Sequence, residues 1–179
     1  MIAQMSYFDG LSLREQMEEQ ISSLTYPALQ RLVVLLLRSM GYRDVRIVDG
    51  GRPRGYSRFG GMSMIARSPG PIQSSQTLIQ VKQIALQRRY VDELRGAMQR
   101  WGSGQGIIIT TGSIAEKSRF CADLFPGRPV RLISRSQLAK LLIDKNLGVR
   151  TAPLPAGSSN DLLVDELFFE LLAESKQRQ

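Results

Sequence analysis

Apolar residues recur at helical spacing in two segments near the start of the chain. Residues 26–40 are apolar around most of the helix circumference, with Pro27 in the first turn and Gly41 just past the end. Proline suits a first helical turn and glycine suits the position after a helix, so this segment predicts a largely buried helix. Residues 11–22 predict a shorter, more polar helix with a narrow apolar stripe formed by Leu13, Met17 and Ile21.

Three strand-like stretches follow, separated by two loop-like stretches. The predicted strands are residues 45–48, 62–66 and 77–82, which are rich in apolar residues. Residues 49–61 hold five glycines, one proline and three arginines, and residues 67–76 are rich in serine, proline and glutamine. Such compositions break regular structure, so both stretches are predicted loops.

Strands and helices alternate in the next part of the chain. The predicted helices and strands are residues 89–101, 106–110, 113–124, 130–133 and 135–144, of which the second and fourth are strands. Ser134 and Gln137 have the spacing of a capping box at the start of the last helix. Three successive strands followed by alternation predict an α/β fold with a mixed central sheet and helices on both of its faces.

The C-terminal part reads as a linker followed by a helix. Residues 151–160 contain two prolines, two serines and a glycine, which is typical of a linker. Residues 161–174 predict an amphipathic helix, acidic outside, whose apolar stripe is formed by Leu163, Leu167 and Leu171 with Phe168 and Leu172 beside it. We expect this helix to dock on its own domain or on a second copy in a homodimer; the alternative is a partner protein.

Charge is unevenly distributed along the chain. Its 179 residues carry a formal net charge of +8, yet residues 151–179 hold five acidic and two basic side chains, a net charge of −3. Residues 1–150 therefore carry +11. A domain this basic favours a polyanionic partner, because phosphates neutralised by lysine and arginine release their counterions.

Composition excludes several classes of site. One cysteine, Cys121, and no histidine are present, which rules out a disulfide framework, a zinc cluster and a Ser–His or Cys–His catalytic pair within one chain. The longest apolar run, residues 32–37, is far shorter than the roughly 20 residues of a membrane span. Residues 1–10 lack the basic start and apolar stretch of a signal peptide. We expect a cytoplasmic protein with no membrane partner.

The most informative short pattern is Gln80-Val81-Lys82 at the end of an apolar strand. Alternation along a strand places Gln80 and Lys82 on one face and Val81 on the other. A lysine in a central strand is unusual, because a buried ammonium group is costly without a partner. The pattern therefore marks a candidate site.

Together these segments resemble the Mrr-type branch of the PD-(D/E)XK nucleases. Six short pieces occur in the family's order: a Gly-aromatic pair, a Gly-Gly-x strand, a Gln-x-Lys strand, a Gly-x-x-x-Thr-Thr strand, a Leu-Ile-x-x-x-x-Leu segment and a closing Gly-Val. They are residues 41–42, 60–63, 80–82, 106–111, 132–138 and 148–149. The resemblance covers residues 26–149 and implies a restriction-endonuclease-like, three-layer α/β/α fold.

This resemblance suggests a division of the chain into four parts. A helical extension of residues 1–25 precedes a core domain of residues 26–150, which is followed by a linker of residues 151–160 and the C-terminal helix of residues 161–179.

The chain departs from the family at the acidic positions. Ser63 stands where the family has a metal-binding aspartate, and Gln30 where the long helix has a glutamate, while Gln80 and Lys82 keep the Gln-x-Lys pair. In active relatives the carboxylates hold Mg²⁺ and the lysine helps to position the attacking water. Because Gln30, Ser63 and Gln80 offer only neutral oxygens, we expect no cofactor, no metal site and an inactive nuclease.

A displaced carboxylate is the alternative. Asp49, Asp92 and Glu93 are the candidates for a Mg²⁺-dependent endonuclease, although a turn residue and two acids in a first helical turn explain them equally well.

Basic residues near Lys82 predict a surface for double-stranded DNA. Five arginines are interleaved with aromatic residues and glycines in a short stretch, and two more begin the helix after the Lys82 strand. The predicted DNA-binding residues are Arg43, Arg46, Arg52, Arg54, Arg58, Lys82, Arg88 and Arg89. Three functions follow: a DNA-binding pseudo-nuclease acting in defence or mobile-element maintenance, a true nuclease, or a protein-binding adaptor.

Overall fold

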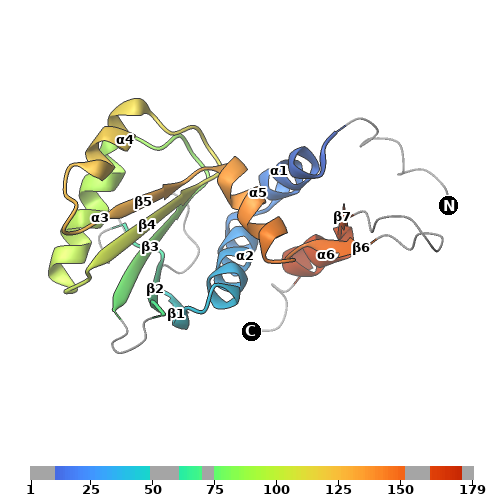
Figure 1. Ribbon diagram of the computed structural model, residues 1–179, viewed down its shortest axis with the longest axis horizontal. Helices are drawn as coiled ribbons and strands as arrows, with labels where there is room; N and C mark the ends of the chain where they lie inside the picture. Colours follow the sequence, from blue (N-terminus) through green and yellow to red (C-terminus); the bar gives the residue numbers. More distant parts are fainter. Residues whose placement is uncertain (1–10, 49–60, 70–74, 152–161, 175–179) are drawn as a thin grey trace.

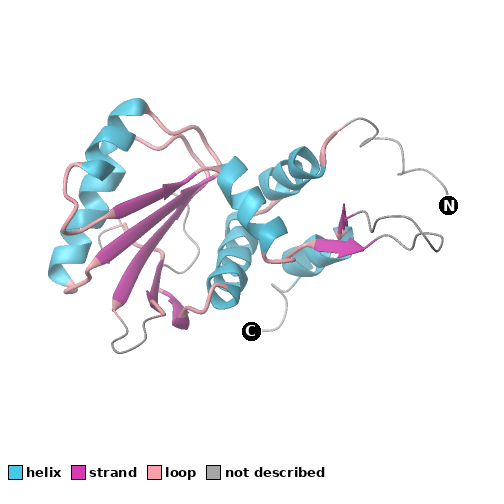
Figure 2. Cartoon of the chain, in the orientation of Figure 1, coloured by secondary structure: helices cyan, strands magenta, loops and turns pink. Residues whose placement is uncertain are grey.

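The computed structural model describes residues 11–48, 61–69, 75–151 and 162–174. A five-stranded sheet lies between two layers of helices, and a two-stranded sheet lies near the C-terminal helix (Figures 1 and 2). The helices are α1 (Leu13–Ser23), α2 (Tyr26–Ser39), α3 (Arg88–Arg100), α4 (Glu116–Asp123), α5 (Arg135–Asp144) and α6 (Glu166–Glu174). The strands are β1 (Arg43–Ile47), β2 (Met64–Arg67), β3 (Gln76–Lys82), β4 (Gln105–Thr110), β5 (Val130–Ile133), β6 (Val149–Thr151) and β7 (Leu162–Val164).

The main sheet is mixed, as the order of its elements predicts. Its strand order is β1-β2-β3-β4-β5. The β1/β2 and β2/β3 pairs are antiparallel, whereas β3, β4 and β5 run parallel. Lys82, the last residue of β3, pairs with Thr110, the last residue of β4, so the strand ends that carry the Gln-x-Lys pattern lie at one edge of the sheet.

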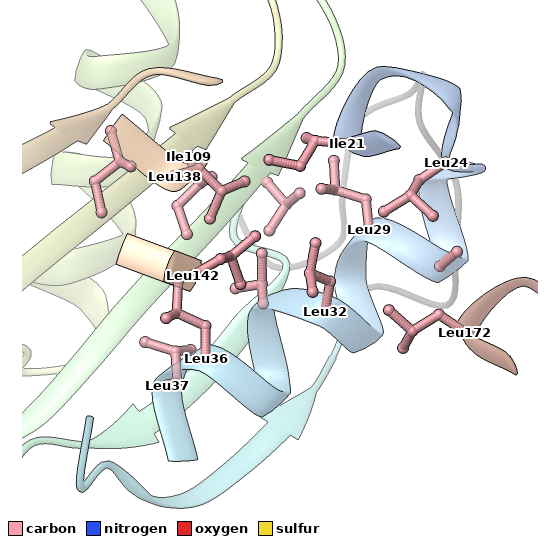
Figure 3. Close-up of a cluster of buried hydrophobic side chains, with 14 of the residues drawn as sticks. Ile21, Leu24, Leu29, Leu32, Leu36, Leu37, Ile109, Leu138, Leu142 and Leu172 are labelled. Atoms are coloured by element: carbon pink, nitrogen blue, oxygen red, sulfur yellow. The ribbon is translucent and has the colours of Figure 1, made fainter. Parts of the chain in front are cut away.

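One face of the sheet is covered by α1, α2 and α5, with α6 packed on the outside of α2. Leucines of α2 pack between Leu138 and Leu142 of α5, Ile109 of β4 and Leu172 of α6 (Figure 3). Ile79 and Val81 of β3 belong to the same cluster. The largely buried helix predicted at residues 26–40 is thus confirmed, and the α1 stripe residues Met17 and Ile21 are fully buried.

The other face is covered by α3 and α4. Val91, Leu94 and Met98 of α3 are fully buried against Leu78 of β3 and Ile108 of β4. Because Leu78 and Val81 belong to different clusters, alternation along β3 sends Gln80 and Lys82 toward α3. The predicted three-layer α/β/α architecture is confirmed.

Local signals place several helix ends correctly. Pro27 lies in the first turn of α2, and Gly41 has φ +88° just after its end. The capping box of α5 is present: the Ser134 hydroxyl accepts the Gln137 N–H, and the Gln137 side chain accepts the Ser134 N–H. The predicted bounds of α5 and β5 match the structure.

Other boundaries shift by a few residues. The first predicted strand begins at Arg43 rather than at residue 45, and the second spans residues 64–67 rather than 62–66. The helix predicted at residues 113–124 begins only at Glu116, because Leu86 and Ile114 form a bridge between the segments that follow β3 and β4.

The prediction for the C-terminal segment was wrong in two respects. Residues 162–164 form β7, which pairs antiparallel with β6, and the helix begins only at Glu166, after the Asp165 side chain accepts the Phe168 N–H. The helix also turns a different face inward: Phe169 and Leu172 are buried, whereas Leu167 and Leu171 are 61% and 56% exposed.

No helix in the described ranges has the length and apolar character that crossing a membrane requires.

Candidate functional site

Two cationic side chains meet at Tyr90, at the edge of the sheet where β3 ends. The Lys82 ammonium lies 4.8 Å from the centre of the Tyr90 ring, and the Arg89 guanidinium lies at the same distance. Arg89 Nη2 also donates to the Tyr90 hydroxyl at 2.8 Å. Within the described ranges neither cation has a carboxylate at ion-pair distance.

Gln80 lies two residues earlier on the same face and is fully buried. Its Nε2 donates to the Gly61 carbonyl at 2.6 Å, whereas its Oε1 has no hydrogen-bond partner among the described residues. Gly61 has φ +82°, and a side chain there would meet Gln80 Nε2 at 2.5 Å, so only glycine fits this turn. The Gln80 amide nitrogen is therefore held by the Gly61 carbonyl, and the amide oxygen can accept a further hydrogen bond.

Ser63 takes part in a closed ring of three hydrogen bonds. The Val81 N–H donates to Ser63 Oγ at 3.1 Å, and the Tyr26 hydroxyl donates to the Val81 carbonyl at 3.3 Å. Because that donation uses the only Tyr26 hydroxyl proton, the 3.1 Å contact between Ser63 Oγ and Tyr26 is donated by Ser63. All three groups are buried, so the hydroxyl serves the sheet edge rather than an open cleft.

Gln30 lies on α2, four residues after Tyr26, and is 2% exposed. Residues four apart share one side of a helix, so Gln30 and Tyr26 both face the sheet. The structure thus places Ser63, Gln80 and Lys82 around the start of β2 and the end of β3, with Ser63 on the α2 side of the sheet and the Gln-x-Lys pair on the α3 side.

The candidate carboxylates Asp92 and Glu93 lie in different surroundings on α3. Asp92 forms an ion pair with Arg88 at 3.3 Å and accepts a hydrogen bond from the Cys121 thiol at 3.3 Å, so its side chain faces α4. The Cys121 thiol is buried; its burial and, to a smaller extent, that hydrogen bond raise its pKa. Glu93 lies on the other side of α3, where its Oε2 is 3.0 Å from the position of a Gly61 side chain. Asp49 lies outside the described residues.

The positions at which the resemblance places acidic metal ligands carry Gln30, Ser63 and Gln80, none of which has a carboxylate. Mg²⁺ depends on carboxylate oxygens to compensate its charge. Of the described carboxylates, that of Glu93 lies beside Gly61, and the Ser63 oxygen is already engaged. Across the described part of the chain, no group of three histidine, cysteine, aspartate or glutamate side chains could hold a metal ion.

The predicted DNA-binding arginines that the structure describes lie in two places. Arg43 and Arg46 are exposed on β1, and Arg88 and Arg89 are exposed at the start of α3. Arg43 pairs with Arg67 at the far end of β2, about 20 Å along the sheet from Lys82. Arg52, Arg54 and Arg58 lie outside the described residues.

Comparison with known protein families decides the assignment. The Mrr_cat family model, described as restriction endonuclease, matches residues 21–142, more than half of the chain. The chain belongs to the Mrr_cat family of restriction endonucleases. The match runs from the end of α1 to α5 and so includes Ser63, Gln80, Lys82 and both layers of helices.

Two solved structures are similar to this chain at low sequence identity. The DNA modification-dependent restriction endonuclease AspBHI has a TM-score of 0.51 and 17% identity, over 75% of this chain and 35% of that chain. The MspJI restriction endonuclease, solved with a 27-mer oligonucleotide, has a TM-score of 0.41 and 20% identity, over 76% of this chain and 28% of that chain. The chain thus spans about a third of the length of these proteins. No curated protein matches it significantly.

Two residues of this Mrr_cat site escaped the sequence analysis. Tyr90 was not singled out from the sequence, and Gly61 was noted only within a predicted loop and the Gly-Gly-x piece of residues 60–63. The signal for Tyr90 is its place in the first turn of the helix after the Gln-x-Lys strand, on the side that faces that strand. The signal for Gly61 is its place just before a buried strand, where the backbone turns.

Proposed function

We propose that this Mrr_cat domain binds double-stranded DNA and does not cleave it. The observation that carries the proposal is the Lys82 ammonium, which lies at the edge of the sheet on the Tyr90 ring with no carboxylate in ion-pair contact among the described residues. A cation in that position repels Mg²⁺ and attracts phosphate. The Arg89 guanidinium, which lies on the same ring, adds a second hydrogen-bond donor that can bind phosphate.

The Ser63 ring supports the same proposal. At the position of the family's metal-binding aspartate, the serine hydroxyl both accepts and donates within the protein. The hydroxyl carries no negative charge with which to bind a metal ion. The duplex is the proposed partner, and its backbone phosphates rather than its bases are the groups that lysine and arginine would contact first.

Glu93 favours a second candidate, a divalent-metal-dependent endonuclease. Its carboxylate lies beside Gly61, whose carbonyl holds the Gln80 amide, and the Gln80 Oε1 has no partner among the described residues. One carboxylate and one amide oxygen are two of the oxygen ligands that Mg²⁺ uses, with water and phosphate oxygens completing its shell.

Binding and cleavage can be measured on one labelled duplex. We expect the protein to bind the duplex in EDTA, and to leave it intact after incubation with Mg²⁺ or Mn²⁺. Lys82→Met should weaken binding about tenfold, since a charged hydrogen bond to phosphate is lost. Lys140→Met is the matched control, because Lys140 is an exposed lysine on α5.

Each other outcome points elsewhere. Cutting that needs a divalent ion and is lost in both Lys82→Met and Glu93→Gln would establish the nuclease and overturn the inert binder. Failure to bind any duplex at low salt would leave a protein-binding adaptor, the third function that the sequence suggests.

A further inference from the structure

A cavity of about 550 Å³ lies between α3 and the segment that follows α4. Its apolar lining includes Met98, Leu124 and Phe125, and the last two are 46% and 58% exposed. The cavity is at the opposite end of the sheet from Lys82, because its lining leads directly into β5 while Lys82 pairs with the last residue of β4. It is therefore separate from the site at Tyr90.

Two arginines give this cavity a positive rim. Arg95 is half-buried: it stacks on the Phe125 ring at 4.5 Å and donates to the Ala122 carbonyl at 2.9 Å, while its buried Nε has no partner among the described residues. Arg128 is exposed at the mouth. No carboxylate of the described residues pairs with either arginine. An apolar floor bordered by two arginines that form no ion pair with a described carboxylate suits a ligand that combines apolar side chains with carboxylates.

The exposed face of α6 has the complementary chemistry. Leu167 and Leu171, one turn apart, are more than half exposed, and Glu170 and Glu174 are exposed on the same side of the helix. The opposite side of α6 is buried through Phe169 and Leu172. This helix therefore displays a short leucine stripe bordered by acidic residues.

The two surfaces cannot meet within one chain. Helix α6 packs on α2, in the layer opposite to α3 and α4, as Figure 1 shows. Contact between them needs two molecules, and it joins unlike surfaces of the two. Such a head-to-tail contact leaves one cavity and one α6 unused in each pair, so it can continue to a third copy.

We propose that the cavity between α3 and the segment that follows α4 binds the exposed leucine–glutamate face of α6 from a second copy of this chain. Leucine side chains of the incoming helix cover Phe125 and Leu124, and its glutamates lie against Arg95 and Arg128. A nucleic acid is the other ligand that arginines and an aromatic ring could accept. The acidic helix fits better because Phe125 is already stacked by Arg95 and the rest of the floor is aliphatic.

The test uses two variants that each remove one half of the contact. Phe125→Glu places a carboxylate in the cavity, and Leu167→Glu places one in the leucine stripe. Both residues are more than half exposed, so both variants should keep the wild-type melting temperature. Phe120→Glu is the matched control, since Phe120 is 68% exposed on α4 and does not line the cavity.

Molecular mass in solution gives the answer by light scattering over a range of concentrations. Wild type and Phe120→Glu should grow beyond one chain as concentration rises, and Phe125→Glu and Leu167→Glu should each stay at one chain. A mixture of the latter two should form pairs and nothing larger, because one supplies an intact helix and the other an intact cavity.

Three results would overturn the proposal. They are a wild type that stays at one chain, variants that associate as wild type does, and a mixture that fails to pair. If Phe125→Glu and Arg128→Glu instead lower the affinity for a duplex at unchanged mass, the cavity serves nucleic acid. Loss of duplex binding in Lys82→Met concerns the other end of the sheet, so failure of one proposal leaves the other standing.

Discussion

The Ser63 hydroxyl continues a hydrogen-bond ladder that the β2 backbone does not complete. The last paired residues of β2 and β3 are Met64 and Ile79, and two residues further on the Val81 N–H finds its acceptor in the Ser63 side chain. Tyr26 closes the ring from α2. A buried N–H without an acceptor costs more than an average hydrogen bond contributes, which makes this hydroxyl important to the sheet edge.

Replacing Ser63 with alanine should therefore destabilise the fold. We expect Ser63→Ala to lower the free energy of unfolding by about 1–3 kcal/mol, because it leaves the Val81 N–H buried and unsatisfied. Tyr26→Phe should cost about 1 kcal/mol, and the double variant should cost less than the sum, since both act on one ring. Urea denaturation measures all three. Ser39→Ala, at an exposed helix end, is the control; an equal loss there would show that the ring has no special weight.

At the scale of elements, the docking of α6 on α2 rests on few residues. Phe169 and Leu172 are buried, and the Arg31 guanidinium donates from Nε at 3.1 Å and from Nη2 to the Leu172 carbonyl near the end of α6. Gly148 lies against the Phe169 ring, where a side chain would meet it at 2.8 Å. This helix is thus part of the core, although the family match ends before it.

Truncating Phe169 tests that packing. Phe169→Ala should cost about 3–5 kcal/mol, the range for a large aromatic side chain in a core, and should speed hydrogen exchange in α6. Leu167→Ala, on the same helix but 61% exposed, should change stability by no more than about 0.5 kcal/mol. Similar losses in the two variants would contradict the observed orientation of α6.

Elements with strong local signals could be predicted from the sequence, and those that depend on distant partners could not. Pro27 and the Ser134–Gln137 box act within one helical turn, so they fix helix ends whatever the surroundings. Strand β7 has three residues and forms only because β6 lies beside it. The inward face of α6 was ambiguous because residues 167–169, 171 and 172 are all apolar, and the choice depends on where α2 presents its own leucines.

The same limit applies to the candidate site. Alternation alone placed Gln80 and Lys82 on one face, and the structure confirms it. The partners of these residues come from far along the chain: Tyr26 reaches Ser63 across 37 positions, and Gly61 reaches Gln80 across 19. No periodicity in the sequence encodes such contacts, so the use of Ser63 in the sheet could not be predicted.

At the scale of the whole molecule, charge is segregated. Residues 1–150 carry a net charge of +11 and residues 151–179 a net charge of −3, which together give +8. The four arginines that the structure describes among the predicted DNA contacts are exposed at two places, on β1 and at the start of α3. A duplex that lay across both β1 and the start of α3 would contact both places. A shorter contact centred on Tyr90 would reach only Arg88, Arg89 and Lys82.

The salt dependence of duplex binding distinguishes these two footprints. Each neutralised phosphate adds about 0.9 to the slope of log affinity against log salt, so five contacts give a slope of about −4.5. If β1 takes part, Arg46→Gln and Arg89→Gln should each reduce its magnitude by about 0.9, and the double variant by about 1.8. Arg14→Gln with Lys140→Gln removes the same charge from other surfaces and should leave the slope unchanged. A loss in Arg89→Gln alone would confine the duplex to the Tyr90 edge, and a slope near zero would contradict phosphate binding altogether.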